Sequence, residues 1–216
     1  MFNTVIFDMD GTISDSAYGI TRCAQHALRH FGIEVENLEE LRFFVGPPLI
    51  EAFMEGYGLT LEQAEEAREI FRRRYTEKGI YENRIYPGIE ELVRKLNRRG
   101  KTLAVATSKP EIFAKEILKN YGILDCFSLV AGADLEGKRA SKIQVLEDVF
   151  RRMEITEEQK PHTVMVGDRI YDVEAAARFG IACIGVGYGY AGPDELVGAD
   201  LYAPTVEVLS RLLLNN

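Results

Sequence analysis

A short apolar run that leads directly into a group of carboxylates is the feature that most constrains this chain. Residues 5–16 read VIFDMDGTISDS, so Asp8, Asp10 and Asp15 follow the apolar residues at close intervals. Asp and Gly are both depleted in β-strands, and neighbouring carboxylates raise each other's pKa at a cost in free energy. Strand propensity therefore does not explain this stretch, and a partner that compensates its negative charge is expected.

The composition limits the classes of protein to consider. A chain of 216 residues that is 46% hydrophobic and 28% charged has the composition of a globular core, with or without a small second domain. The formal net charge of −8 argues against general binding of nucleic acid or of anionic membranes. No apolar run reaches the roughly 18 residues of a membrane span, and the odd, widely spaced cysteines predict no disulfide framework. We expect a cytoplasmic protein, a monomer or a homodimer, without nucleic-acid or membrane partners.

The order of helix and strand patterns predicts the fold. Residues 3–8 have the pattern of a buried strand, and the chain from Ser14 to about Tyr86 has the pattern of four helices, with Asn37 and Thr60 as expected N-caps. From Pro87 onward, short apolar strands alternate with helices, as in a parallel sheet covered on both faces. We expect an α/β fold: a doubly wound, Rossmann-like parallel sheet formed by residues 1–14 and 86–216, interrupted by an α-helical cap at residues 15–85.

Small or acidic polar residues stand where three of the expected strands end. Asp8 ends the first strand, Thr107 and Ser108 end the strand TLAVATS, and Asp168 follows the strand TVMVG. In an open parallel sheet, ligands bind beyond the carboxyl ends of the strands. These side chains are therefore expected to meet at one edge of the sheet.

The spacing of the aspartates indicates a metal site. Asp8 and Asp10 are two residues apart and would point to one side of an extended chain, whereas Asp168 and Asp172 are four apart and would share a helix face. Two like charges 4 Å apart repel by about 4 kcal/mol at an effective dielectric constant of 20. A hard divalent cation would cancel this repulsion, and because all the ligands are oxygens, Mg²⁺ is the natural choice.

Carboxylates, a metal and nearby hydroxyls indicate phosphoryl transfer. One aspartate could attack phosphorus as a nucleophile while another gives and takes the proton. Gly11 permits close backbone approach, and Thr107 and a lysine could donate hydrogen bonds to the developing negative charge. The residues alone do not distinguish the nucleophile from the proton carrier.

Four segments carry a resemblance to a known family. DMDGT at 8–12, TSK at 107–109, ASKIQ at 140–144 and GDRIYD at 167–172 resemble the motifs of the haloacid dehalogenase superfamily. The helical insert resembles the cap of the subclass that contains phosphoglycolate phosphatase and β-phosphoglucomutase. The match extends over the whole chain.

The resemblance implies a role for each motif residue. It makes Asp8 the nucleophile and a metal ligand, and Asp10 the general acid and base, with the main-chain carbonyl of Asp10 also on the metal. It makes Asp168 a Mg²⁺ ligand and Asp172 a support of the metal shell. The implied phosphate-binding residues, of which Lys142 also bridges nucleophile and phosphate, are Gly11, Thr107, Ser108 and Lys142.

Three lysines are candidates for the active-site lysine. Lys109, in the second motif, and Lys138, just before the third, are the alternatives to Lys142, and Ile143 stands where related sequences commonly have proline. We favour Lys142 because Ser141 is a good N-cap, which would put the lysine at a helix N-terminus beside an anion site. For Arg169 the sequence suggests only a surface or substrate contact.

Other motifs are given plainer interpretations. GYGYAG at 187–192 fits a dinucleotide-binding pattern, but no long helix follows it, so we interpret it as a glycine-permitted loop beside the active edge. Cys23, His26 and His30 have helical spacing but no further ligand nearby, and we expect packing and surface roles for them. Asp15 and Ser16 are expected to cap a helix, although contact with substrate is an alternative.

The expected function is that of a Mg²⁺-dependent phosphatase acting on a small phosphate ester through an aspartyl phosphate. The resemblance suggests phosphoglycolate first and nucleoside monophosphates, as for a 5′-nucleotidase, second. A β-phosphoglucomutase-like phosphotransferase is the nearest alternative in chemistry. A non-catalytic sensor of phospho-ligands is disfavoured, because a binder needs no proton carrier at Asp10. The expected determinants of specificity lie in the cap, at 46–48, Arg42 and 72–83.

Overall fold

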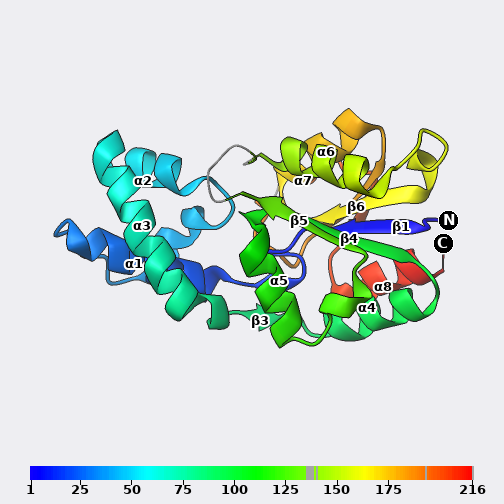
Figure 1. Ribbon diagram of the computed structural model, residues 1–216, viewed down its shortest axis with the longest axis horizontal. Helices are drawn as coiled ribbons and strands as arrows, with labels where there is room; N and C mark the ends of the chain where they lie inside the picture. Colours follow the sequence, from blue (N-terminus) through cyan, green and yellow to red (C-terminus); the bar gives the residue numbers. More distant parts are fainter. Residues whose placement is uncertain (135–138, 140, 193, 216) are drawn as a thin grey trace. The chain divides into compact units, whose positions relative to one another are not determined.

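The structure is a computed structural model that describes residues 1–134, 139, 141–192 and 194–215. The described chain forms two compact units. One unit comprises Met1–Ser14 and Ile85–Asn216, and the other comprises Asp15–Arg84 (Figure 1). Lys138, one of the alternatives for the active-site lysine, lies outside the described residues.

The first unit is built on a parallel sheet with β1 near its middle. The strand order is β5-β4-β1-β6-β7-β8, and every neighbouring pair is parallel. The expected α/β, doubly wound fold is confirmed. The strands are β1 (Thr4–Phe7), β4 (Thr102–Pro110), β5 (Leu129–Ala133), β6 (Thr163–Gly167), β7 (Ala182–Val186) and β8 (Leu201–Ala203).

Helices cover both faces of this sheet. On one face lie α4 (Ile89–Arg98), α5 (Glu111–Asn120) and α8 (Val206–Leu214); on the other lie α6 (Lys142–Met153) and α7 (Ile170–Phe179) (Figure 1). Because each central strand is covered on both sides, its residues are apolar without alternation. The core beneath α6 and α7 contains Ile6, Ala104 and Met165 from three adjacent strands. Two 3-10 turns, η3 (Leu124–Cys126) and η4 (Lys160–His162), complete this unit.

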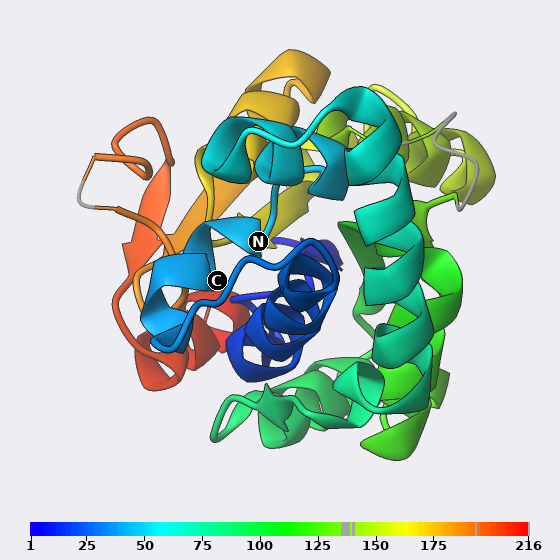
Figure 2. The same cartoon turned by 90° about the vertical axis from the view of Figure 1, so that its left-hand side faces the viewer.

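The second unit is helical. It contains α1 (Ala17–His30), η1 (Leu38–Phe44), α2 (Leu49–Tyr57), α3 (Leu61–Glu77) and the 3-10 turn η2 (Gly79–Tyr81), and both α1 and α2 pack against α3 (Figure 2). Thr60 and Gln63 form the expected capping box at the start of α3. Asn37 also caps as expected, but the helix that it starts is of the 3-10 type. The prolines at 47 and 48 follow it closely and favour a short helix, because proline disfavours the α conformation in the residue before it.

Short strands occur at the two linkers, where the sequence predicts none. β2 (Ser14–Asp15) and β3 (Arg84–Ile85) form a two-stranded sheet. Strands of two residues carry no period that a sequence pattern could reveal. The three-residue strand β8 is also absent from the sequence prediction for the same reason.

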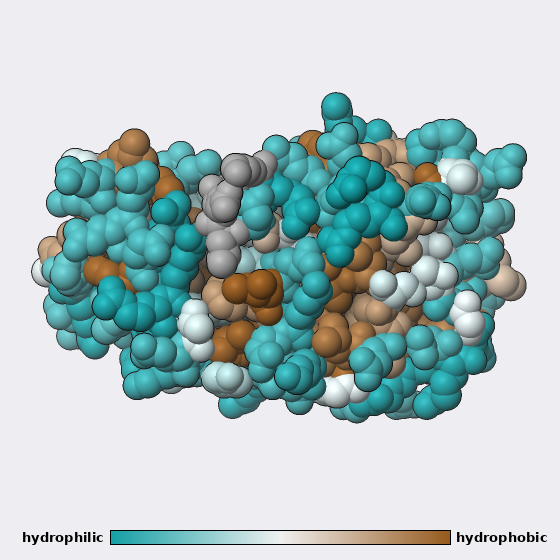
Figure 3. Space-filling model, viewed as in Figure 1, coloured by the Kyte–Doolittle hydropathy of each residue, from teal (hydrophilic) through white to brown (hydrophobic). Residues whose placement is uncertain are grey.

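Polar side chains cover most of the molecular face seen in Figure 3, in keeping with a chain that is 28% charged. Within the described residues, no helix has the length and apolar character needed to cross a membrane.

Candidate active site

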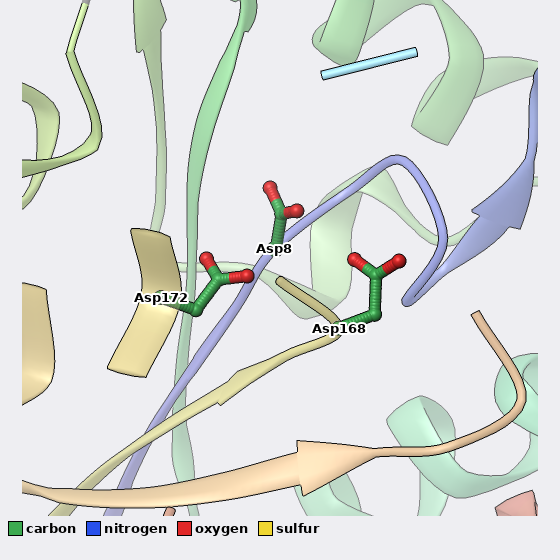
Figure 4. A group of neighbouring side chains, drawn as sticks. All are labelled: Asp8, Asp168 and Asp172. Atoms are coloured by element: carbon green, nitrogen blue, oxygen red, sulfur yellow. The ribbon is translucent and has the colours of Figure 1, made fainter. Parts of the chain in front are cut away.

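Three carboxylates converge beyond the carboxyl ends of β1 and β6. Asp8, Asp168 and Asp172 are all buried, and each offers a carboxylate oxygen that lies within 4.8 Å of the others (Figure 4). Asp8 directly follows β1, Asp168 directly follows β6, and Asp172 lies in the first turn of α7. The sheet therefore brings together residues that are far apart in the sequence, at the edge where a parallel sheet binds ligands.

Backbone geometry fixes the position of each aspartate. The N–H of Asp8 donates to the carbonyl of Val166 at 2.8 Å, which extends the β1–β6 pairing by one residue. The N–H of Arg169 donates to Asp172 Oδ2 at 3.1 Å. Gly167 permits this approach, because a Cβ at position 167 would lie 2.2 Å from Asp172 Cγ. A side chain at 167 would thus displace the carboxylate of Asp172.

Gly11 is required by both conformation and space. Its φ of +84° lies in the region that only glycine adopts readily, and its N–H closes a turn by donating to the carbonyl of Ser14 at 2.9 Å. A Cβ on Gly11 would lie 2.0 Å from Asp168 Oδ2. The turn after β1 therefore approaches the aspartate that follows β6 through a glycine.

Lys142 is the cation that contacts this cluster. Its Nζ lies 2.5 Å from Asp8 Oδ1 and 2.9 Å from Asp172 Oδ1, and it donates to the carbonyl of Ala106 at 3.0 Å. Ser141 and Gln144 form a capping box that starts α6 at Lys142. Lys142 therefore contacts Asp8, the first aspartate of the motif DMDGT. Ser141 caps the helix that starts at Lys142, which is the feature for which the sequence favoured this lysine.

Asp10 lies apart from the three clustered carboxylates and has a different lysine. Lys109 Nζ lies 3.1 Å from Asp10 Oδ2. The other oxygen, Asp10 Oδ1, is buried and has no hydrogen-bond partner within the described part of the chain. Lys109 thus contacts the predicted proton carrier, whereas Lys142 contacts the predicted nucleophile.

The hydroxyl residues of the second motif lie at the end of β4. Thr107 is buried, and its Oγ1 accepts a hydrogen bond from the N–H of Lys109 at 3.1 Å. Since the hydroxyl acts as the acceptor in that bond, it can still donate its own proton. Ser108 is half-buried.

Burial and mutual repulsion perturb the clustered groups. Burial, reinforced by the charges of Asp172 and Asp10 and opposed by Lys142, raises the pKa of Asp8 to about 7. Burial and the charges of Asp8 and Asp172 also raise the pKa of Asp168 well above its usual value. Burial lowers the pKa of Lys142, but Asp172 and Asp8 outweigh it, so the net pKa is raised. The cluster therefore has more negative charge than one lysine compensates.

This excess charge fits a divalent cation. The cluster offers only oxygen atoms, it is buried, and its lysine contacts Asp8 and Asp172 while Asp168 is held by neutral donors. Hard cations such as Mg²⁺ prefer this ligand chemistry. Of the groups of three or more His, Cys, Asp or Glu residues in the described chain, this is the one that could hold a metal.

The histidines of α1 do not join such a group. Cys23 is buried and accepts a hydrogen bond from Arg74 Nη1 at 3.1 Å, whereas His26 is exposed. His30 lies on the surface with its Nε2 3.0 Å from Glu66 Oε1. The placement matches the packing and surface roles expected from the sequence.

Two residues that flank the motifs have contacts outside the carboxylate cluster. Arg169, for which the sequence suggested a surface or substrate contact, forms an ion pair with Glu195 at 2.7 Å. Asp15 Oδ1 accepts a hydrogen bond from the N–H of Ala17 at 3.2 Å, a local bond at the start of α1 of the kind expected for a capping residue. Ser16 occupies the N-cap position of α1, but its side chain forms no cap hydrogen bond, contrary to expectation. Neither Arg169 nor Asp15 belongs to the carboxylate cluster.

Comparison with known proteins identifies the family. Residues 5–186 match the family model of the haloacid dehalogenase-like hydrolases. The chain belongs to this family.

Named relatives agree with this assignment. The chain is 42% identical over 195 residues to a 5′-nucleotidase of Pseudomonas aeruginosa, covering 90% of this chain and 87% of the relative. It is 42% identical over 190 residues to the tyrosine-protein kinase PtkA of Mycobacterium tuberculosis, covering 88% of this chain but 64% of that protein. A phosphoglycolate phosphatase of Pseudomonas savastanoi pv. phaseolicola is 31% identical, with 86% and 70% covered.

A solved structure extends the likeness to the whole chain. A "predicted phosphatase" from Clostridium acetobutylicum superposes with a TM-score of 0.92 at 38% identity and full coverage of both chains. The expectation of a haloacid dehalogenase superfamily hydrolase is confirmed, and the expected phosphatase activity is supported by the family and by the names of its members.

Proposed function

We propose that this protein is a Mg²⁺-dependent phosphatase that hydrolyses small phosphomonoesters through an aspartyl phosphate on Asp8. The observation that carries the proposal is the buried cluster of Asp8, Asp168 and Asp172 with Lys142 Nζ 2.5 Å from Asp8. Buried charges of this density destabilise a fold unless a ligand uses them. A divalent cation would compensate the negative charge of the three carboxylates, and a phosphoryl group would pair with the positive charge of Lys142.

The residues that would hold the cation are Asp8 and Asp168 through their side chains and Asp10 through its main-chain carbonyl, with Asp172 in support. Mg²⁺ supplies positive charge that shields the phosphoryl oxygens from the attacking carboxylate. The role of Asp172 follows from its contacts, since its Oδ1 forms an ion pair with Lys142 Nζ and its Oδ2 accepts a hydrogen bond from the N–H of Arg169. It therefore fixes Lys142 against Asp8.

In the first step, a carboxylate oxygen of Asp8 attacks phosphorus while the bond from phosphorus to the ester oxygen breaks. Asp10, in its acid form, gives its proton to the leaving oxygen. Lys109, 3.1 Å from Asp10, stabilises the carboxylate that remains. The products of this step are the free alcohol and a phosphoryl group on Asp8.

In the second step, a water molecule attacks the phosphorus of the aspartyl phosphate. Asp10 now takes a proton from that water, and the bond between phosphorus and the oxygen of Asp8 breaks. Inorganic phosphate leaves, and Asp8 returns as a carboxylate beside Lys142. Both steps need one aspartate as nucleophile and another as proton carrier. Lys142 contacts the proposed nucleophile Asp8, and Lys109 contacts the proposed proton carrier Asp10.

The phosphoryl oxygens need donors as negative charge develops on them. Lys142 and the hydroxyls of Thr107 and Ser108 are the proposed donors. The N–H of Gly11 already donates to the carbonyl of Ser14, so the proposed part of Gly11 is to let the backbone approach the phosphate closely. Residues 15–85 are proposed as the cap that selects the substrate, because the motif residues recognise only phosphate and metal. The contacts that select a particular ester would come from that helical unit.

Nucleoside monophosphates are the first substrates to test. The relative named a 5′-nucleotidase is 42% identical to the chain, whereas the one named a phosphoglycolate phosphatase is 31% identical. This reverses the order that the sequence resemblance suggested. Phosphoglycolate is the second candidate substrate.

A screen for phosphate release tests the proposal. Purified protein with Mg²⁺ is assayed on nucleoside monophosphates, phosphoglycolate, sugar phosphates and phosphotyrosine, with Asp8→Ala as control. We expect metal-dependent release of phosphate from at least one ester, and its loss in Asp8→Ala. Full turnover by Asp10→Asn, or by protein stripped of metal, would contradict the mechanism.

Three further assays separate the alternatives. Isomerisation of a sugar phosphate without net phosphate release would favour a phosphoglucomutase-like transfer, because the acceptor would then be a sugar hydroxyl. Binding of a phosphate ester without turnover would favour a sensor. Transfer of phosphate from ATP to a tyrosine-containing peptide would favour the activity for which PtkA is named.

A further inference from the structure

The loop that follows β7 has a feature that the proposed mechanism does not use. Its sequence at 187–192 is GYGYAG, and it lies at the same edge of the sheet as the aspartates. Within it, the segment 188–190 contacts Asp168 and the turn after β1 from several directions. These contacts connect the loop to the aspartate that the proposed mechanism assigns to the metal.

The first contact is a hydrogen bond from the backbone. The N–H of Tyr190 donates to Asp168 Oδ2 at 2.7 Å, while Thr12 Oγ1 lies 3.4 Å from Asp168 Oδ1. The side chain of Asp168 is fully buried. A buried carboxylate held at both oxygens has a fixed orientation, and hydrogen bonds to its ionised form are roughly twice as strong as neutral ones. The N–H of Tyr190 is also used up, so it is not free to bind the pyrophosphate of a dinucleotide.

The second contact is steric. A Cβ at position 189 would lie 2.4 Å from Asp168 Cβ, from Asp168 Oδ2 and from the carbonyl oxygen of Gly11. Gly189 does not have a positive φ, so its conformation does not require glycine. Glycine is required at position 189 because the neighbouring atoms leave no room for a side chain. Gly11 and Gly189 thus both approach the carboxylate of Asp168, and a side chain on either would displace it.

The third contact ties the loop to the turn after β1. The hydroxyl of Tyr188 donates to the carbonyl of Thr12 at 3.1 Å, and its ring lies edge-on to that of Tyr86 at 4.9 Å between centroids. Thr12 therefore contacts Asp168 through its side chain and Tyr188 through its backbone. The segment 188–190 and the turn at 11–12 enclose the carboxylate between them.

We propose that the segment 188–190 is a positioning element that holds the carboxylate of Asp168 in the orientation needed to bind the divalent cation. Gly189 and the N–H of Tyr190 are its essential parts, and Tyr188 anchors it to the turn after β1. This inference rests on the proposed function, since it assigns Asp168 to the metal. Groups that orient a metal ligand from behind typically change metal affinity about 10–100-fold when altered.

A matched pair of glycine substitutions tests the proposal. Gly189→Ala introduces a methyl group against Asp168, whereas Gly192→Ala introduces the same group in the same loop, 3.6 Å from Glu195 Oε1 and free of close contact. Mg²⁺ binding to each purified protein is measured by calorimetry, and the Mg²⁺ concentration for half-maximal activity is measured separately. We expect Mg²⁺ affinity to fall about 10-fold or more in Gly189→Ala and to change less than about 2-fold in Gly192→Ala.

Folding is checked by circular dichroism and thermal melting without Mg²⁺. A folded Gly189→Ala that binds Mg²⁺ as tightly as the wild type would overturn the proposal, as would an equal loss of affinity in Gly192→Ala. If Gly189→Ala does not fold, hydrogen exchange in the wild type decides instead. Exchange at residues 188–190 is expected to slow when Mg²⁺ is added, and unchanged exchange would overturn the proposal.

The binding measurement also separates this proposal from the proposed function. If the wild type binds Mg²⁺ but hydrolyses no phosphate ester, the proposed function fails, while a loss of binding in Gly189→Ala still supports the positioning role. If the wild type is an active phosphatase and Gly189→Ala is equally active and binds Mg²⁺ equally well, the positioning role fails and the proposed function stands.

Discussion

The two units of the molecule differ in whether they bury charged side chains. All of the residues 15–84 are described, and their buried polar side chains are neutral: Ser16, Thr21 and Gln25. The α/β unit buries six charged side chains among its described residues, namely Asp8, Lys109, Lys142, Asp148, Asp168 and Asp172. Five of these belong to the sequence motifs at the carboxyl ends of β1, β4 and β6 or at the starts of α6 and α7. The buried charges therefore concentrate at the candidate active site of the α/β unit.

Asp148 is the exception, and it shows what structural burial of a charge looks like. It is surrounded by three arginines, with Arg139 at 2.6 Å and Arg152 at 3.1 Å, and Arg151 also in contact. Burial raises the pKa of Asp148, but these arginines outweigh it and the net pKa is lowered. Asp8 and Asp168 are buried with too few cations, so their pKa values are raised. Burial with too few cations, rather than burial itself, distinguishes the candidate active site.

Removing the predicted nucleophile should give the largest effect. We expect Asp8→Asn to reduce kcat by at least about 10⁴-fold, because the change removes the carboxylate that is proposed to attack phosphorus beside Lys142. The metal-free variant should be at least as stable as the wild type, since one of three repelling charges is removed. Steady-state kinetics and thermal melting measure the two effects, with the exposed Asp125→Asn as matched control. Activity within about 10-fold of the wild type would contradict the assignment of Asp8.

The two active-site lysines should differ in their effect on stability. Lys142→Met leaves Asp8 and Asp172 buried without their cation, and breaking such a pair typically costs about 3–5 kcal/mol. Lys109→Met affects Asp10, whose side chain is 14% exposed whereas that of Asp172 is fully buried, so we expect a smaller loss. Urea unfolding of both variants without Mg²⁺ measures the difference. An equal or larger loss of unfolding free energy in Lys109→Met would contradict the expectation that Asp8 and Asp172 depend more on their lysine than Asp10 does.

Magnesium should stabilise the protein more at higher pH. Because the folded-state pKa of Asp8 is raised from 3.8 to about 7, the folded protein holds a proton that the unfolded chain has lost, and the stability of the metal-free form falls as pH rises through that window. Mg²⁺ must displace this proton, so its binding strengthens over the same window. We expect a larger Mg²⁺-induced rise in Tm at about pH 7.5 than at about pH 5.5. A shift that is equal at both pH values, or larger at the lower one, would contradict this linkage.

Loss of the N-cap of α3 should affect stability alone. Thr60→Ala removes the side chain that caps α3, and such caps contribute about 1 kcal/mol. We expect a small drop in the free energy of unfolding, with kcat for the preferred ester unchanged. Glu65→Ala, at an exposed position of the same helix outside residues 72–83, is the control. A loss of kcat in Thr60→Ala that exceeds its loss of stability would show that the capped turn takes part in catalysis.

The parts of the fold that could be predicted are those that carry a local pattern. The strands β1, β4, β6 and β7 can be recognised as continuous apolar runs, because both faces of the sheet are covered. The capping boxes at Thr60 and Ser141 mark the starts of two helices. The strands β2, β3 and β8 have two or three residues, too few for a period. Their existence depends on pairing with neighbours rather than on their own residues.

The motif side chains of the candidate site could be predicted from the sequence, whereas contacts that depend on the tertiary structure or on the backbone could not. The resemblance of the motifs to a known family singled out Asp8, Asp168, Asp172 and Lys142, and the structure brings them together. The assignment of Lys109 to Asp10 depends on the tertiary path of β4 and has no sequence signal. The N–H of Tyr190 is present in every residue type except proline, so no residue pattern could reveal its bond to Asp168.

The most direct test of the account is to trap the phosphoryl group on the protein. Asp10→Asn should still accept a phosphoryl group from an activated ester but should lose it slowly, because no side chain takes the proton from the attacking water. Acid quenching followed by peptide mass spectrometry locates the modification. We predict a phosphoryl group on Asp8, dependent on Mg²⁺ and absent from Asp8→Ala. A phosphoryl group on any other residue, or turnover of wild-type protein with none on Asp8, would contradict the central claim.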